Sequence, residues 1–276
     1  MGVMLRAGAD VAEIDPQMGG GLLRLSTGSS QQWLVAPDNH TPAMFVTVPW
    51  FSRIFPNGQD SFEWLGTAVQ AAQDFPIHGF ARHQPWQVQG QTDSTLALRF
   101  EHPGSAQWTW SFVSQLTYAL SRGQLNVTLD ITNLSATAMP CGLGLHPYIG
   151  QPEGVRLQAG VNEVCVLDAQ GKPVPPFTEP HGALDELVAA RERDHVFLGW
   201  QGACRLSWPQ RQMGLSSNAE YLVVYSPSDQ PWFCVEPVTN LPDGFNRMTQ
   251  DPRACRILSA GETHQLELQI TYNAQL

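Results

Sequence analysis

One carboxylate in this sequence stands among apolar residues, where a charged side chain is unusual. Glu236 lies in Trp232–Val238, a segment that is otherwise apolar and indicates a buried strand. Glutamate is rarely buried unless it is paired or hydrogen-bonded. Burial also raises the pKa of a carboxyl toward the range that suits a general base at neutral pH. Glu236 is therefore a candidate for proton transfer, and a hydrogen-bonded structural acid is the alternative.

Two other segments place titratable side chains among apolar residues, next to Gly or Pro. His78 and Arg82 lie in Phe75–Arg82, and His146 lies in Cys141–Tyr148. Glycine lets a backbone approach closely, and proline ends the pairing of a strand, so both segments suit strand ends near a ligand. Each histidine could transfer protons near neutral pH, or hydrogen-bond within the core.

Arg53, Asp194 and Arg82 are further candidates for polar contacts with a ligand. Arg53 lies in the aromatic-rich segment Trp50–Phe55, where cation–π packing is the structural alternative. Asp194 could simply cap a preceding helical segment, and Arg82 could form a structural ion pair.

Metal-binding patterns are weak in this chain. His78 and His83 are five positions apart, but there is no HExxH motif and no cysteine pair, so we expect no metal. The five cysteines have apolar neighbours and no CxxC spacing, which predicts reduced thiols in a cytoplasmic protein. We expect neither a signal peptide nor a transmembrane helix.

Strands are the elements that must position these side chains. Period-2 alternation of apolar and polar residues predicts a β-rich chain, and Ser121-Arg122-Gly123 predicts a hairpin turn. The alternating segments are Leu22–Ser26, Ser94–Phe100, Trp108–Leu120, Gln124–Thr132 and Thr263–Tyr272. No βαβ rhythm is present. We therefore predict an all-β fold, a single large antiparallel β-sandwich spanning residues 1–276.

Helical signal is restricted to two short segments. Ala183–Arg193 predicts two or three helical turns, and Thr67–Asp74 predicts one or two. The expected fold thus carries one or two short helices.

Composition and motifs exclude several classes of function. The 276 residues carry a formal net charge of −10, which argues against nucleic acid or an anionic membrane as partner. GxSxG, P-loop and GxGxxG motifs are absent, so nucleophile-elbow hydrolases and nucleotide-binding folds lack support. Nothing in the sequence separates a monomer from a homodimer.

Taken together, the unusual segments resemble the aldose 1-epimerase (galactose mutarotase) family, from about Arg53 to Asn246. Five pieces occur in the order typical of that family, and its fold is a large antiparallel β-sandwich. The pieces are Ser52-Arg53-Ile54, His78-Gly79-Phe80-Ala81-Arg82 with Trp86 beyond, Leu145-His146-Pro147-Tyr148, Asp194-His195-Val196-Phe197 and Val235-Glu236-Pro237-Val238-Thr239-Asn240.

The resemblance implies a role for each candidate residue. Glu236 matches the general base that deprotonates the anomeric hydroxyl of a monosaccharide, and His146 matches the general acid that protonates the ring oxygen. Arg53, His78 and Asp194 match residues that hold sugar hydroxyls. No cofactor and no metal is implied. Aromatic residues could supply an apolar face for the sugar, or belong to the core; they are Trp50, Phe51, Trp86 and Tyr148.

The substrate stays open because the pattern departs from galactose-type members. Ser52 stands where many of those members carry Asn, and the segment around His146 has one histidine where they often have two. The segment ending in Arg82 is similar to branches that include hexose-6-phosphate mutarotases, so Arg82 could meet a phosphate. A non-catalytic sugar-binding or regulatory module is a third possibility.

Overall fold

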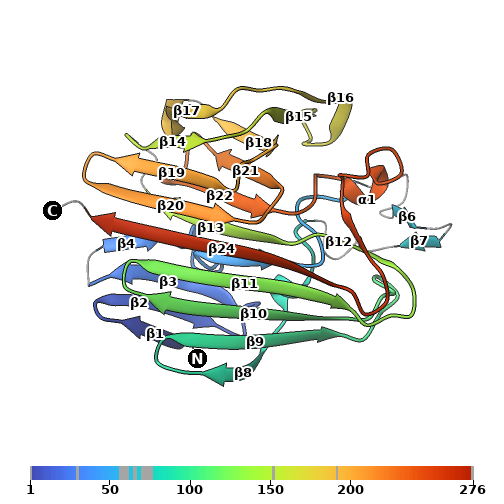
Figure 1. The fold of residues 1–276 in the computed structure, drawn as a ribbon, viewed down its shortest axis with the longest axis horizontal. Helices are drawn as coiled ribbons and strands as arrows, with labels where there is room; N and C mark the ends of the chain where they lie inside the picture. The colour runs from blue at the N-terminus through green and yellow to red at the C-terminus, as the bar shows by residue number, and fades with distance from the viewer. Residues whose placement is uncertain are drawn as a thin grey trace.

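The computed structural model describes residues 2–28, 31–55, 62–64, 67–69, 77–150, 153–190 and 192–274, and two large antiparallel sheets dominate it (Figure 1). The 11-stranded sheet has the order β1-β2-β3-β5-β13-β22-β21-β18-β15-β16, with β4 paired to β3. The 9-stranded sheet has the order β17-β14-β19-β20-β24-β11-β10-β9-β8. The prediction of a large antiparallel β-sandwich is confirmed.

The strands are short in the first sheet and long in the middle of the second. The 11-stranded sheet contains β1 (Val3–Ala7), β2 (Asp10–Asp15), β3 (Gly21–Thr27), β4 (Gln31–Leu34), β5 (Met44–Thr47), β13 (Gly144–Gly150), β15 (Glu163–Leu167), β16 (Pro173–Pro180), β18 (Arg193–Leu198), β21 (Tyr221–Ser226) and β22 (Trp232–Val238). The 9-stranded sheet contains β8 (Gln87–Gln91), β9 (Thr95–His102), β10 (Phe112–Ser121), β11 (Gln124–Asn133), β14 (Arg156–Ala159), β17 (Leu184–Leu187), β19 (Ala203–Trp208), β20 (Arg211–Ser217) and β24 (Thr263–Ala274). Two small pairs are β6 (Phe62–Trp64) with β7 (Thr67–Val69) and β12 (Met139–Cys141) with β23 (Arg256–Leu258).

The predicted alternating segments form β3, β9, β10, β11 and β24, although β10 begins only at Phe112. The predicted hairpin joins β10 to β11, and its Gly123 has a φ of 71°, a left-handed conformation that glycine adopts without strain. Alternation along β11 buries every second residue, as expected for a strand with one face on the core. The hydroxyl of Tyr118 on β10 donates a 2.8 Å hydrogen bond to the carbonyl of Gly20, which ties the two sheets together.

The strands β13 and β22 lie in the middle of the 11-stranded sheet and are buried on both faces. Leu145, Phe233 and Val235 point into the main core between the sheets. Successive side chains of a strand point to opposite faces. His146 and Glu236 therefore lie on the outer face of the 11-stranded sheet.

Both helix predictions are wrong in the part of the chain that the structure describes. Within Ala183–Arg193, Leu184–Leu187 forms β17 and Val188–Ala190 forms only a 3-10 turn. Pairing of β17 with β14 overrides the helical propensity of this segment. Thr67–Val69 is strand β7, and residues 70–74 of the second prediction lie outside the described residues.

Helical structure occurs elsewhere. The α-helix α1 (Gly244–Arg247) follows β22 (Figure 1). A 3-10 turn spans Ala81–His83. No helix in the described ranges is long and apolar enough to cross a membrane. All five cysteines are buried and unpaired, as predicted.

Candidate active site

The register of β13 and β22 brings the two predicted proton-transfer residues into contact. Gly144 pairs with Val238 and Tyr148 pairs with Cys234, which leaves His146 opposite Glu236. Nε2 of His146 lies 3.3 Å from Oε1 of Glu236, and the two side chains are only 8% and 2% exposed. The two predicted catalytic residues therefore form one buried pair.

Burial shifts the pKa values of this pair in opposite directions. Burial, with a smaller contribution from the charge of Asp194, raises the pKa of Glu236 well above 4.5. Burial lowers the pKa of His146 from 6.5 to about 3. The protein interior thus favours a protonated carboxyl beside a neutral imidazole over a carboxylate beside an imidazolium. Both forms hold a single proton, so the two residues titrate as a unit.

The pair also has polar atoms to offer a ligand. Oε2 of Glu236 and Nδ1 of His146 are buried and have no hydrogen-bond partner among the described residues. Buried polar atoms normally have partners, and exceptions need an explanation. A polar ligand that enters from the outer face of the sheet would supply one.

His78 is fixed beside this pair by Ser52. The main-chain N–H of Ser52 donates to Nδ1 of His78 at 3.1 Å, and burial lowers the pKa of His78. The imidazole is therefore neutral, accepts at Nδ1 and carries its proton on Nε2. Its ring is edge-on to that of His146, with ring centroids 5.3 Å apart. His78 is thus a hydrogen-bond donor at the edge of the pair.

The loop that carries Arg53 is fastened to the end of β22 by two side chains. Oδ1 of Asn240 accepts from the main-chain N–H of Phe51 at 2.8 Å, and Nδ2 of Asn240 donates to the carbonyl of Phe51 at 3.1 Å. Oδ1 of Asp243 accepts from the N–H of Phe55 at 2.9 Å. The Asn at the end of the segment Val235–Asn240 is therefore a structural residue. The side chain of Arg53 is exposed, and its charge contributes to the lowered pKa of His78.

Aromatic rings line the approach to His146. The ring of Phe45 stacks on His146 with centroids 4.3 Å apart, and Tyr148 lies 4.8 Å away on the same strand face. The guanidinium carbon of Arg82 lies 4.5 Å from the Phe45 centroid, so Arg82 makes a cation–π contact. Phe45, Arg82 and Tyr148 also line a pocket of about 320 Å³, together with Gln17, Met18, His40, Thr41, Pro42 and His83. That volume is at the lower end of the range for small-molecule sites.

Asp194 reaches the same face from two strands away. It pairs with Tyr225 on β21, which pairs with Cys234 on β22. Its side chain is solvent-exposed, yet the surrounding protein raises its pKa by desolvation, and its charge raises that of Glu236. The capping alternative for Asp194 is wrong, because a strand and a 3-10 turn precede it in place of a helix.

Some residues around the site escaped the sequence reasoning. Cys234 lies on the face of Glu236, and the ligand atoms of Cys234, His146 and Glu236 are all within 4.8 Å of one another. Alternation along Trp232–Val238 could have revealed this neighbour, because residues two apart share a face.

Two aromatic residues expected as a possible sugar platform lie in the core. Trp50 and Trp86 each expose only 1% of their surface. His78 is buried whereas His83 is exposed and accepts from Nε of Arg82 at 2.9 Å.

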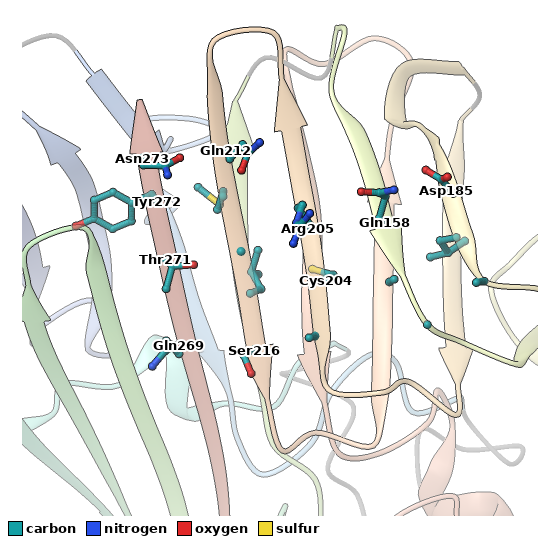
Figure 2. Close-up of a pocket in the computed structure, with 18 of the residues that line it drawn as sticks. Gln158, Asp185, Cys204, Arg205, Gln212, Ser216, Gln269, Thr271, Tyr272 and Asn273 are labelled. Carbon is teal, nitrogen blue, oxygen red and sulfur yellow. The ribbon is translucent and has the colours of Figure 1, made fainter. Parts of the chain in front are cut away.

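A second, larger concavity of about 900 Å³ lies on the outer face of the 9-stranded sheet. Figure 2 shows Gln158, Arg205 and Gln212 on neighbouring strands of this face. None of the six predicted site residues lines it. The candidate active site is therefore the His146–Glu236 face of the other sheet.

Comparison with known proteins identifies relatives of this chain. The chain is 26% identical over 224 residues to the uncharacterized protein YphB of Escherichia coli (strain K12), covering 74% of this chain and 75% of YphB. It is 26% identical over 248 residues to the uncharacterized protein YihR of the same strain, covering 80% of this chain and 76% of YihR.

The fold is similar to that of a galactose 1-epimerase from Lactobacillus acidophilus NCFM. The TM-score is 0.80 at 13% identity, over 100% of this chain and 95% of that one. The family model of aldose 1-epimerase matches residues 4–271. This chain therefore belongs to the aldose 1-epimerase family.

Proposed function

We propose that the protein is an aldose 1-epimerase, a mutarotase that interconverts the α and β anomers of a free hexose or a related monosaccharide. The observation that carries the proposal is the buried contact of 3.3 Å between Nε2 of His146 and Oε1 of Glu236. Opening a hemiacetal needs a proton removed at one oxygen and delivered at another on the same carbon. Two adjacent titratable groups meet this requirement.

In the proposed reaction, Glu236 takes the proton of the anomeric hydroxyl while His146 protonates the ring oxygen. The bond between C1 and the ring oxygen breaks as the C1 carbonyl forms. Rotation about C1–C2 exposes the other face of the carbonyl. Closure returns the proton of Glu236 to the carbonyl oxygen, and His146 recovers the proton of the attacking hydroxyl. No net proton is exchanged with solvent.

Burial has a defined role in this cycle. After ring opening, Glu236 is protonated and His146 is neutral, which is the uncharged form that the pKa shifts favour. The interior therefore stabilises the pair while the open-chain sugar is bound. Before opening, the pair must carry a carboxylate and an imidazolium. Oε2 of Glu236 has no hydrogen-bond partner among the residues that the structure describes, and hydrogen bonds from sugar hydroxyls to it offset part of that cost.

The remaining predicted residues are proposed to orient the sugar. His78 donates from Nε2, while Asp194 and Arg53 meet hydroxyls from the exposed side. Phe45 and Tyr148 offer an apolar surface to the C–H groups of the ring.

Anomer exchange measured by NMR across a panel of free sugars tests the proposal. Replacement of Glu236 by Gln is expected to lower the rate about 100-fold or more while the fold is kept. His146→Ala should do the same, whereas His102→Ala, a part-buried histidine of the opposite sheet, should leave the exchange rate unchanged. Near-normal exchange in Glu236→Gln protein would reject the mechanism. Sugar binding without exchange in the unmodified protein would instead indicate a non-catalytic sugar-binding module.

A hexose 6-phosphate is the second candidate substrate, and the 320 Å³ pocket favours it. Its lining includes Arg82, His40 and His83 but no carboxylate among the described lining residues. A guanidinium recognises phosphate well. Exchange rates of glucose and glucose 6-phosphate separate the candidates: if Arg82→Ala weakens exchange of the phosphorylated sugar alone, the phosphorylated substrate is favoured.

A further inference from the structure

The thiol of Cys234 lies beside the proposed acid–base pair but has no part in ring opening. Cys234 is fully buried, and its position two residues before Glu236 directs it to the same face of β22. Its sulfur and the ligand atoms of His146 and Glu236 all lie within 4.8 Å of one another. We propose that these three residues form an inhibitory binding site for Zn²⁺ and similar borderline-soft divalent cations.

The spacing of the three ligands is close to that of a zinc site. Tetrahedral zinc bonds of about 2.0–2.3 Å separate neighbouring ligand atoms by roughly 3.3–3.8 Å. Nε2 of His146 and Oε1 of Glu236 already stand 3.3 Å apart. With one sulfur in the set, the sulfur should lie about 3.5 Å from each of the other two ligand atoms, so it needs an approach of roughly 1.3 Å at most, which a side-chain rotation provides. Three protein ligands leave the fourth position open to water.

The charges of the site suit a divalent cation. Asp194 places negative charge near both Glu236 and Cys234. A dication with one thiolate, one carboxylate and one neutral imidazole forms an uncharged buried unit, which limits the desolvation cost. Binding transfers the thiol proton, and any proton on Glu236, to solvent. The buried Oε2 of Glu236, which has no hydrogen-bond partner among the described residues, is a further possible ligand atom for the cation.

The ligand types of Cys234, His146 and Glu236 decide which cations the site takes. Sulfur and imidazole donors select Zn²⁺ and Co²⁺ over Mg²⁺ and Ca²⁺. Occupancy would remove both members of the acid–base pair from catalysis. That inhibitory consequence rests on the proposed function, whereas binding itself does not.

Titration of tag-free protein with Co²⁺ tests the site by spectroscopy. We expect one equivalent to bind, with the visible bands of tetrahedral Co²⁺ and a thiolate-to-cobalt charge-transfer band in the near ultraviolet. Replacement of Cys234 by Ser should abolish the charge-transfer band and raise the dissociation constant more than about 100-fold, since loss of an outer partner alone costs 10- to 100-fold. Cys204→Ser, which alters a buried thiol of the other sheet, is the matched control and should leave both unchanged. Absence of the band in the unmodified protein, or its persistence in Cys234→Ser, overturns the proposal.

Anomer exchange supplies the second measurement. Stoichiometric Zn²⁺ should suppress exchange, EDTA should restore it, and Mg²⁺ should have no effect. Zinc binding without inhibition would overturn the inhibitory role. If the protein shows no exchange with any sugar, the cobalt titration still decides whether the metal site exists, so failure of the proposed function and failure of the metal site are distinguishable.

Discussion

Ser52 and His78 hold each other by two reciprocal contacts. The main-chain N–H of His78 donates to the carbonyl of Ser52 at 2.9 Å, and the N–H of Ser52 donates to Nδ1 of His78 at 3.1 Å. Both residues have left-handed backbones, with φ of 62° and 65°. Such non-glycine conformations cost about 1–3 kcal/mol each and concentrate at ligand sites. In return for this cost, the hydrogen bond from Ser52 to Nδ1 fixes the tautomer of His78 and keeps an N–H donor at Nε2.

Loss of that donor should weaken catalysis without abolishing it. His78→Ala removes the proposed neutral hydrogen bond to the sugar, so kcat/KM should fall roughly 10-fold. Asparagine tolerates a left-handed backbone and keeps an N–H donor. The loss in His78→Asn should therefore be smaller, as measured by saturation kinetics of anomer exchange. Equal rates in His78→Ala and unmodified protein would remove His78 from the site.

The acid limb of the pH profile should lie well below 6.5, the ordinary pKa of histidine. The proposed mechanism requires a single proton on the His146–Glu236 pair, and a second proton would go to His146. Burial lowers the pKa of His146 to about 3 and also lowers that of His78, so both imidazoles stay neutral as the pH falls through 6.5. Rates of anomer exchange, corrected for uncatalysed mutarotation, give the profile. A limb near 6.5 would show that the pair is hydrated and not buried.

Glu236→Gln should stabilise the protein while it inactivates it. The folded-state pKa of Glu236 is raised above 4.5, so the fold loses stability as the pH rises from 4.5 through that folded-state value. Each unit of that shift corresponds to about 1.4 kcal/mol. Glutamine has no such loss, and each kcal/mol should raise Tm by roughly 2–4 °C.

Thermal melts at about pH 5 and about pH 8 provide the check on this stabilisation. The advantage of Glu236→Gln should be small at the lower pH and larger at the higher. A Tm below that of the unmodified protein at the higher pH would contradict burial of an ionisable carboxyl.

Gly79→Ala should destabilise the site segment through a direct clash. Gly79 has a φ of 66°, and a Cβ there would lie 2.1 Å from the carbonyl oxygen of Val48. Gly154 has a φ of 70° but open space around its Cβ position. Gly154→Ala therefore measures the cost of a left-handed backbone in a non-glycine residue without a clash. Gly154→Ala should cost about 1–2 kcal/mol and Gly79→Ala clearly more, with reduced anomer exchange. Denaturant unfolding of both variants measures the difference, and equal costs would refute the close approach.

The strands were predictable because alternation is a local property. Leu125, Val127 and Leu129 follow period 2 in the sequence and face the core in β11. The helix predicted over Ala183–Arg193 failed because β14 offers Leu184–Leu187 a pairing partner that propensity does not include. The roles of Trp50 and Trp86 were also undecided in the sequence, since an aromatic residue beside a polar segment suits a core and a ligand surface equally well.

By itself, the sequence determined the core-facing residues of alternating strands such as β11 and which residues resemble a mutarotase site. Glu236 could be recognised as an anomalous acid because burial of a strand can be inferred from its immediate neighbours. Tertiary structure alone decided that β13 lies beside β22, so that His146 meets Glu236 at 3.3 Å and Cys234 lies within reach of both. Strand neighbours and desolvation depend on segments distant in the chain. For that reason the contact of the pair and the lowered pKa of His146 could not be derived before the fold was known, whereas the raised pKa of Glu236 followed from its apolar neighbours in the sequence.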